Sequence, residues 1–226
     1  MRIVCFGDSV TRGISFVEGR LRILKDNYPA LLQKTLTSLN NVQVINKGVF
    51  NDNSNLLMDR LNSDVLSLSP DYVLVEIGGN DCNFKWEEVA RCPEEQHEPI
   101  VPLDKYIENI KQLIGSLRKS GAVPVLLTLP PLDPVRYYKK LVQTYGQGIA
   151  HWIALCGGIE HWHGLYNRYL TEMINAWNVR SIDIRTAFKK AGDLSLLLSD
   201  DGIHPTLEGY RVMSREVCEG LRPYME

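Results

Sequence analysis

The chain opens with Arg2-Ile3-Val4-Cys5-Phe6-Gly7-Asp8-Ser9, an apolar run that ends in a tight polar turn. Four further short apolar runs follow, at Val42–Asn46, Tyr72–Ile77, Val123–Thr128 and Val179–Ile184. Near-continuous apolar strands are typical of a parallel sheet that is buried on both faces. The sequence therefore predicts about five parallel strands, of which Arg2–Phe6 is the first.

Between these runs the chain has the pattern of helices. Segments 28–39, 106–117 and 207–221 repeat apolar residues at helical spacing, and Thr206 is placed to cap the last of them. Strands that alternate with helices form βαβ units with right-handed crossovers. We therefore expect an α/β fold, a three-layer α/β/α sandwich.

Composition narrows the class of protein. The 226 residues fit a single domain, 1–226, and 44% of them are hydrophobic, enough for a full core. The formal charge is -2 with no run of Lys or Arg, which argues against nucleic acid as a partner. Five cysteines without a CxxC pair indicate reduced thiols. The pattern of a signal peptide and any apolar run long enough for membrane insertion are both missing, so a cytoplasmic location is expected.

Two long segments are not accounted for by the predicted strands and helices of the sandwich. Phe84–Leu103 is rich in glutamate and proline, which predicts a long loop. Pro130–Gly164 is long for a connection and carries aromatic residues, several of them at helical spacing, which predicts a packed insertion at about 130–164. We expect this insertion to fold over the carboxyl edge of the sheet and to help form a substrate pocket. Packing on the outer wall and a dimer contact are the alternatives.

Polar, glycine-bearing turns follow three predicted strands, and a fourth precedes the last helix. They are Gly7–Ser9, Asn46–Gly48, Gly78–Asp81 and Asp201–Pro205. In an open α/β sheet, ligands bind outside the carboxyl ends of the strands. These turns are therefore expected at one edge of the sheet, where they would form the site.

The residue types in these turns suit acyl transfer. A serine hydroxyl such as that of Ser9 is a weak nucleophile until a neighbouring base takes its proton, and His204 is suited to that task. Asp201 precedes His204 by three residues, close enough to fix the imidazole tautomer. The backbone N–H groups of Ser9 and Gly48 and the side-chain amide of Asn80 are the candidate donors to the oxyanion.

These turns carry a family resemblance. The chain resembles the SGNH hydrolases, also called the GDSL esterases and lipases, from residue 3 to about the end of the last helix. The matching blocks are GDS at Gly7–Ser9, a glycine within Asn46–Asn51, GGND at Gly78–Asp81 and DGIHP at Asp201–Pro205. The resemblance implies a flavodoxin-like sandwich, no metal or cofactor, and hydrolysis of small carboxylic esters through an acyl-enzyme. It also implies that the catalytic and oxyanion residues are Ser9, Gly48, Asn80, Asp201 and His204.

Other readings are open at this stage. The same residues would serve a carbohydrate O-deacetylase or a thioesterase, and a catalytically silent binding module is a further alternative. Cys156, Glu160, His161 and His163 suggest a metal, but their spacing matches no standard site, so no metal is predicted. Asp8 and Asp81 are expected to be structural hydrogen-bonding groups, and Asp200 a solvated neighbour. Because the resemblance implies ester hydrolysis, the expected partner is a small-molecule ester.

Overall fold

The computed structural model describes residues 1–37 and 41–224. A five-stranded parallel sheet lies at its centre, with strands in the order β4-β1-β5-β6-β7. These strands are β4 (Gln43–Gly48), β1 (Arg2–Gly7), β5 (Tyr72–Glu76), β6 (Val123–Leu127) and β7 (Arg180–Ile182). The five apolar runs of the sequence are the five strands, which confirms the predicted parallel sheet.

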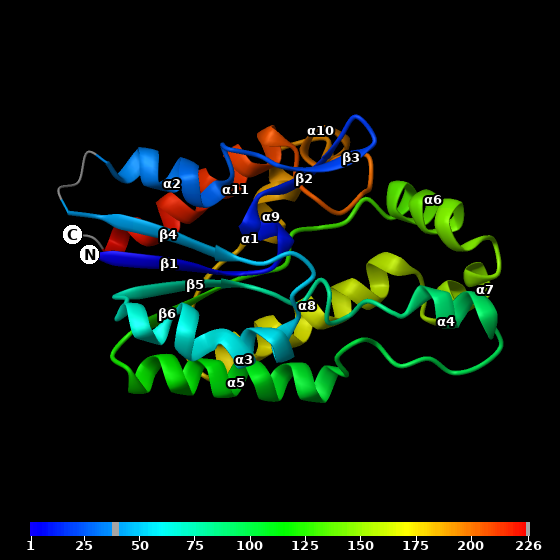
Figure 1. Ribbon diagram of the computed structural model, residues 1–226, viewed down its shortest axis with the longest axis horizontal. Helices are drawn as coiled ribbons and strands as arrows, with labels where there is room; N and C mark the ends of the chain where they lie inside the picture. The colour runs from blue at the N-terminus through cyan, green and yellow to red at the C-terminus, as the bar shows by residue number, and fades with distance from the viewer. Residues whose placement is uncertain (38–40, 225–226) are drawn as a thin grey trace.

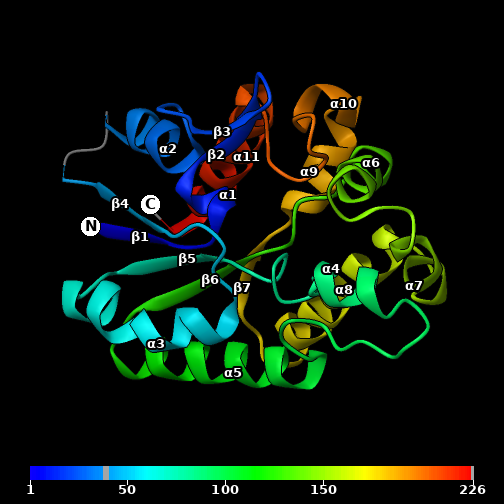
Figure 2. The ribbon, with the colours of Figure 1, turned by 45° about the vertical axis from the view of Figure 1, so that its right-hand side comes forward.

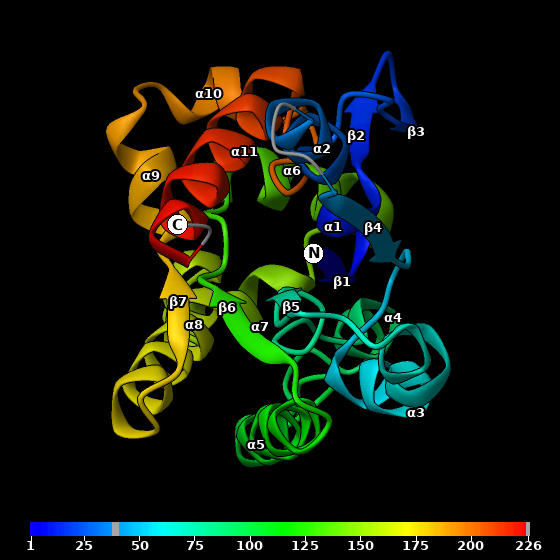
Figure 3. The same ribbon diagram turned by 90° about the vertical axis from the view of Figure 1, so that its left-hand side faces the viewer.

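Helices cover both faces of the sheet, as Figure 3 shows in a view along the strands. One face packs against α3 (Ser54–Asp64), α5 (Leu103–Lys119) and α8 (Ile159–Ala176). The opposite face packs against α2 (Tyr28–Leu36), α9 (Ile184–Lys190) and α11 (Leu207–Leu221). Successive residues of β1 alternate between the two cores, since Val4 and Phe6 belong to one and Ile3 and Cys5 to the other. The three-layer sandwich is confirmed.

The predicted helices have the expected positions. The side chain of Thr206 caps α11 by accepting a hydrogen bond from the Gly209 N–H at 3.2 Å. Leu39, which was predicted on the face of the first long helix, lies outside the described residues. Two 3-10 turns, η1 (Leu66–Leu68) and η2 (Arg222–Tyr224), and the short helix α10 (Leu194–Leu197) complete the sandwich.

An antiparallel hairpin, which the sequence analysis did not predict, follows the first turn of the chain. Its strands are β2 (Ile14–Val17) and β3 (Arg20–Ile23), and they begin just after the four-residue helix α1 (Ser9–Arg12). Glu18 and Gly19 at its tip both have positive φ, as a two-residue hairpin turn requires. The Phe16 N–H donates to the Ser199 Oγ, which joins the hairpin to the loop that holds His204.

A group of helices stands beyond the carboxyl ends of the strands (Figures 1 and 2). It consists of α4 (Trp86–Arg91), α6 (Pro134–Tyr145), α7 (Ile149–Leu155) and the start of α8. The prediction that Phe84–Leu103 is a loop throughout is therefore wrong at α4. Trp86 and Val89 of that helix are buried, whereas Glu87 and Glu88 face solvent, so the acidic residues belong to an exposed helix face.

This helical cap has a hydrophobic core of its own. The core joins residues from the two long segments 84–103 and 130–164: Phe84, Trp86, Val89, Leu132, Tyr137, Leu141 and Ile149. None of these residues belongs to a strand of the central sheet. The packed insertion predicted at 130–164 is therefore combined with residues 84–89. Within the described residues, no helix is both long and apolar enough to cross a membrane.

Candidate active site

Ser9 lies where β1 runs into α1, at the carboxyl edge of the sheet. Asp8 caps this helix, since its Oδ1 accepts a hydrogen bond from the Val10 N–H at 2.9 Å. Ser9 is the first helical residue, so its own N–H has no acceptor within the helix. Its side chain is buried but lines a pocket. Both the hydroxyl and the backbone N–H therefore lie at the amino end of a helix.

Ser9, His204 and Asp201 form a continuous hydrogen-bonded chain. The His204 Nε2 lies 2.9 Å from the Ser9 Oγ, and the His204 Nδ1 lies 2.6 Å from the Asp201 Oδ2. Because an ionised carboxylate only accepts, the proton of neutral His204 belongs on Nδ1, and Nε2 is left to accept the serine proton. The structure thus brings together the three residues that the sequence analysis grouped.

The Asp201 carboxylate is held by more than the imidazole. Its Oδ1 also accepts hydrogen bonds from the Ser199 hydroxyl at 3.1 Å and from the N–H groups of Ile203 at 3.0 Å and His204 at 3.1 Å. Burial alone would raise the pKa of Asp201, but the His204 side chain and these N–H groups outweigh it and hold the pKa below its ordinary value. Asp201 therefore stays ionised beside His204.

The turn that carries Asp201 and His204 is joined to the cap. Gly202 has a φ of 75°, in the left-handed region. A Cβ at this position would lie 2.5 Å from both the Asp133 O and the Tyr137 N, so only glycine fits against the start of α6. The Asp133 N–H in turn donates to the Gly202 O at 2.9 Å. The loop that carries Asp201 and His204 is thus connected to the helical cap backbone to backbone.

Asn80 projects from the turn after β5, next to the turn after β4. Its Nδ2 donates to the Asp52 O at 2.7 Å, and the neighbouring Asp81 carboxylate accepts from the Ser54 N–H. An amide nitrogen carries two N–H groups, so one of them is left for a ligand in the pocket that Asn80 lines. Burial raises the pKa of Asp81 to about 7, and its contacts are those of a structural group.

Gly48, a predicted oxyanion donor, ends β4 and packs against α1. Its N–H donates to the Asn46 Oδ1 at 2.9 Å, so it already has an acceptor within the protein. A Cβ on Gly48 would lie 2.1 Å from the backbone N of Arg12, which shows that glycine is needed for close packing against α1. Glycine at this position therefore sets the distance between β4 and α1, and the role of Gly48 as an oxyanion donor stays a prediction.

Two supporting groups were not predicted from the sequence. Arg60 of α3 donates to the Gly7 O at 3.0 Å, to the Lys47 O at 2.9 Å and to the Asp52 Oδ2 at 2.6 Å. It thereby ties the ends of β1 and β4 to Asp52, whose backbone oxygen accepts a hydrogen bond from Asn80. Arg60 lies among polar residues of a helix, where a solvent-exposed side chain is expected, so the sequence around it does not predict these contacts.

The second group is Glu76, the last residue of β5, which is 2% exposed. Burial raises the pKa of Glu76 well above its ordinary value, and the nearby Asp8 raises it further. Burial also raises the pKa of Asp8 to about 6, against the hydrogen bond from the Val10 N–H. The two carboxyl groups lie close enough for each to affect the pKa of the other. A buried carboxyl pair therefore lines the same pocket as Ser9.

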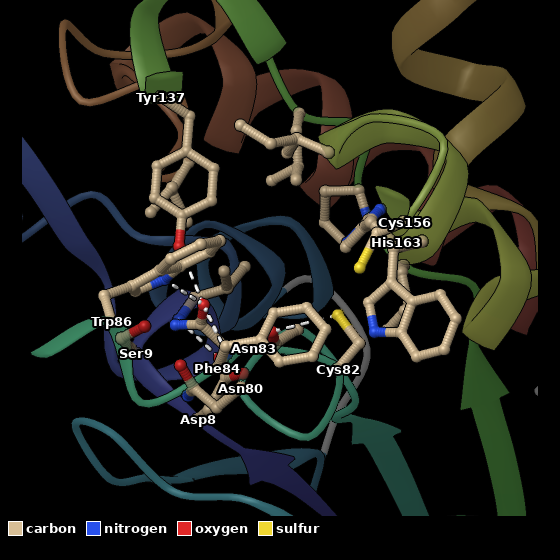
Figure 4. A pocket seen from close by; sticks show the side chains of 18 of the residues that line it. Asp8, Ser9, Asn80, Cys82, Asn83, Phe84, Trp86, Tyr137, Cys156 and His163 are labelled. Atoms are coloured by element: carbon tan, nitrogen blue, oxygen red, sulfur yellow. Dashed lines mark hydrogen bonds between the residues drawn. The ribbon is translucent and has the colours of Figure 1, made fainter. Parts of the chain in front are cut away.

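A pocket opens beside Ser9 and extends into the cap. Figure 4 shows Ser9 and Asn80 on one side of it and Cys156 and His163 on the other, with Phe84 between them. Its cavity measures about 80 Å³. The wall combines the strand-end turns with α4, α6, α7 and α8. The insertion therefore covers the carboxyl edge and helps to form this pocket.

Two of the residues that suggested a metal, Glu160 and His163, are partners of Arg185. Arg185 donates to the His163 Nδ1 at 3.2 Å and forms an ion pair with Glu160. Burial and the Arg185 charge lower the pKa of His163 to about 3, so the ring is neutral. Across residues 1–37 and 41–224, no group of three or more His, Cys, Asp or Glu side chains is arranged to hold a metal ion. The five cysteines are not paired in disulfides.

The fold and the site together define a serine-type ester hydrolase built on a three-layer α/β/α sandwich. The chain belongs to the GDSL-like lipase/acylhydrolase family, whose sequence model matches residues 5–212. It is 27% identical over 96% of its length to the uncharacterized lipoprotein YqeF of Bacillus subtilis, and the match covers 88% of that protein. An acetylxylan esterase of Geobacillus stearothermophilus is 25% identical, over 95% of this chain and 90% of the esterase.

The fold also matches solved structures. The crystal structure of a lipase/acylhydrolase from Enterococcus faecalis superposes with a TM-score of 0.73 and 20% sequence identity, covering 99% of this chain and 96% of that one. This likeness supports the same fold across nearly the whole chain. The resemblance noted in the sequence is therefore confirmed, and the protein is a hydrolase that acts on ester bonds.

Proposed function

We propose that Ser9 is the nucleophile of this ester hydrolase, that His204 is its general base and that Asp201 orients the imidazole. The observation that carries the proposal is the hydrogen-bonded chain from the Ser9 Oγ through both ring nitrogens to the Asp201 carboxylate. Ser9 lies 195 positions away from His204 in the sequence, and Ser9 lines a pocket. A binding module has no use for such an arrangement.

The first half of the reaction forms an acyl-enzyme. His204 Nε2 takes the Ser9 hydroxyl proton as the oxygen attacks the ester carbonyl, and the resulting imidazolium is stabilised by Asp201. The carbonyl oxygen becomes an oxyanion, for which the donors in this proposal are the Ser9 N–H and the second N–H of the Asn80 amide. The His204 proton then passes to the leaving alcohol as the bond between carbon and that oxygen breaks.

The second half releases the acid. Water enters in place of the alcohol, His204 takes one of its protons, and the hydroxide equivalent attacks the acyl carbon. Collapse of the second tetrahedral intermediate returns the proton to Ser9. No step calls for a cofactor. In this proposal residues 1–226 act as one catalytic domain, with 130–164 as its insertion.

Cleavage of acetylated carbohydrate is the second candidate. It is favoured by the match to an acetylxylan esterase, a protein whose name states that substrate class. A thioesterase would use the same three residues. The cytoplasmic location stays a prediction, and the name of the Bacillus relative describes a lipoprotein.

The test is a burst experiment with p-nitrophenyl acetate. We expect a rapid release of p-nitrophenol equal to the enzyme concentration or a steady turnover above background, either one lost in Ser9→Ala. Ser63→Ala, at an exposed serine of α3, is the matched control and should behave as the unaltered protein does. Equal activity of Ser9→Ala and Ser63→Ala would refute the assignment of Ser9.

A further inference from the structure

The pocket beside Ser9 changes character along its length. At the Ser9 end it is lined by Asp8, Glu76 and Asn80, the groups that surround the reacting atoms. The remainder is lined mainly by apolar and aromatic side chains from the cap, including Phe84, Trp86, Leu132, Tyr137, Ile153 and Trp162. A ligand group that enters from Ser9 therefore passes from a polar region into an apolar one.

The apolar part is a packed wall. The Phe84 ring stacks on Trp162 at a centroid separation of 5.8 Å and meets the edges of Trp86 and Trp152 at 5.6 Å each. Tyr137 is fixed from the other side, since its hydroxyl donates to the Asn83 Oδ1 at 3.0 Å. Such contacts hold the rings in place, so the wall is largely formed before a ligand arrives.

The far end of the pocket presents no bare charge. His163 is buried and neutral there, and the Arg185 guanidinium behind it is paired with Glu160. The Trp162 Nε1 is buried and has no hydrogen-bond partner among the described residues, so it is a donor that an oxygen atom in a ligand could use. The surroundings otherwise favour hydrocarbon.

We infer that this pocket binds the acyl chain of the ester, and that the preferred chain is an unbranched, unsubstituted aliphatic one longer than acetyl. The inference rests on the proposed function, because Ser9 must carry the acyl group. A cavity of about 80 Å³ exceeds the space of a single water-sized group several times over, so a methyl group leaves most of it empty. Acyl chains of roughly four to eight carbons fill it.

A panel of p-nitrophenyl esters from acetate to palmitate tests the inference, because it varies the acyl chain with one leaving group. Each methylene that enters an apolar wall should raise kcat/KM about threefold to fourfold until the cavity is full. We expect a maximum between butyrate and octanoate. A maximum at acetate, with hydrolysis of acetylated xylose faster than that of hexanoate, overturns the inference and leaves the proposed function standing. Absence of any ester hydrolysis refutes the proposed function instead.

Two further comparisons separate an acyl pocket from its alternatives. p-Nitrophenyl 4-methoxybutanoate has the chain length of the hexanoate but carries an oxygen, and we expect it to react more slowly. A faster reaction means that the pocket recognises a polar chain. If the pocket held the alcohol, hexyl acetate would be hydrolysed far faster than ethyl acetate and the acyl series would be flat. Either result overturns the inference.

Substitutions in and beside the pocket test whether the chain-length preference arises there. Cys156 lines the pocket opposite Ser9 in Figure 4, and Cys156→Phe should fill it and lower the ratio of kcat/KM for hexanoate over acetate by roughly tenfold or more. Leu155→Phe adds an aromatic ring at the adjacent residue, which is 63% exposed, and should leave the ratio unchanged. Ile153→Phe serves as the second filling variant should Cys156→Phe melt early. An unchanged ratio in a folded filling variant rules out an acyl pocket.

Discussion

The Ser9 Oγ and the His204 Nε2 lie 2.9 Å apart, although 195 positions of sequence separate the two residues. Ser9 is held by the end of β1 and the Asp8 cap of α1, and His204 by a loop that Asp201 and Ser199 close with side-chain hydrogen bonds. Ser199 also reaches the hairpin next to α1 by accepting from the Phe16 N–H. Both partners are thus anchored on the same side of the sheet.

We predict that a fluorophosphonate probe labels Ser9. The hydroxyl is hydrogen-bonded to a neutral imidazole, which activates it as a nucleophile. Intact mass should rise by one adduct, and peptide mapping should place the adduct at Ser9. Ser9→Ala should stay unlabelled whereas Ser63→Ala should be labelled in full. An adduct on Ser9→Ala would mean that another residue is the nucleophile.

We predict that Asn80→Ala lowers kcat by about 10²–10³ with little change in KM. The reason is that the free N–H of this amide would meet a charge that exists mainly in the transition state. Steady-state kinetics with the best p-nitrophenyl ester measure both constants. A change confined to KM would show that Asn80 only holds the substrate.

We predict that Asp201→Asn reduces kcat by several orders of magnitude, up to about 10⁴. An asparagine can present an N–H to the His204 Nδ1, which would favour the wrong imidazole tautomer and withdraw the charge that stabilises imidazolium. The same kinetics report the loss, and circular dichroism checks that the loop still folds. A nearly silent substitution would reduce the triad to a dyad of Ser9 and His204.

We predict that the protein loses stability as the pH rises above about 4.5, and that Glu76→Gln weakens this loss. Folding raises the pKa of Glu76, so the folded state keeps a proton that the unfolded chain has already released. The folded state is therefore penalised from the ordinary glutamate pKa up to the raised one, by up to about 1.4 kcal/mol per pH unit. Asp8 adds a similar penalty from about pH 4 to its raised pKa of about 6.

The measurement is urea unfolding at pH 5 and pH 8. Glutamine has no titratable proton, so the difference in unfolding free energy between the two pH values should shrink in Glu76→Gln. Glu219→Gln changes an exposed glutamate of α11 and should leave the difference as it was. Identical differences in all three proteins would show that Glu76 titrates normally in the folded state.

We predict that Gly202→Ala destabilises the protein by roughly 1–3 kcal/mol and impairs catalysis. The new methyl group would meet the backbone of Asp133 and Tyr137, and alanine is strained at a φ of 75°. Gly115→Ala is the control, because that position in α5 has no atom within 4 Å of the new methyl group and alanine favours helix. Chemical denaturation of both variants provides the comparison. Equal stabilities would mean that α6 moves aside without cost.

Much of the sandwich could be predicted because its signals are local. Each strand is a short apolar run that can be recognised in the sequence. Ser9 and Asn80 follow β1 and β5 within a few residues, so their place at the strand ends can be recognised as well. Asp201 and His204 are three residues apart, so their hydrogen bond needs only one turn of chain. The rule that parallel strands end at one edge places the turns of Ser9 and Asn80 together, whereas His204 reaches Ser9 from the loop before α11.

The remaining features depend on contacts between distant segments. Gly48 stands in the expected turn, but the acceptor for its N–H is the Asn46 side chain, which no spacing rule indicates. The segment 84–103 is rich in glutamate and proline, which favours a loop, and the helix α4 forms within it because Trp86 and Val89 pack in one core with Tyr137 and Ile149. The hairpin has a local signal, the Glu18-Gly19 pair between two short runs with alternating apolar residues.

The separate core of the cap has a consequence for how the protein opens. Since that core contains no residue of the sheet, its packing free energy is distinct from that of the sandwich, and the two units are expected to unfold at different free energies. Amide protons of α6 and α7 should then exchange faster than those of β1 and β5. The apolar wall of the pocket would then unfold as a unit while β1 and the Ser9 turn stay folded. The entry of substrate and the stability of the fold would therefore depend on different parts of the chain.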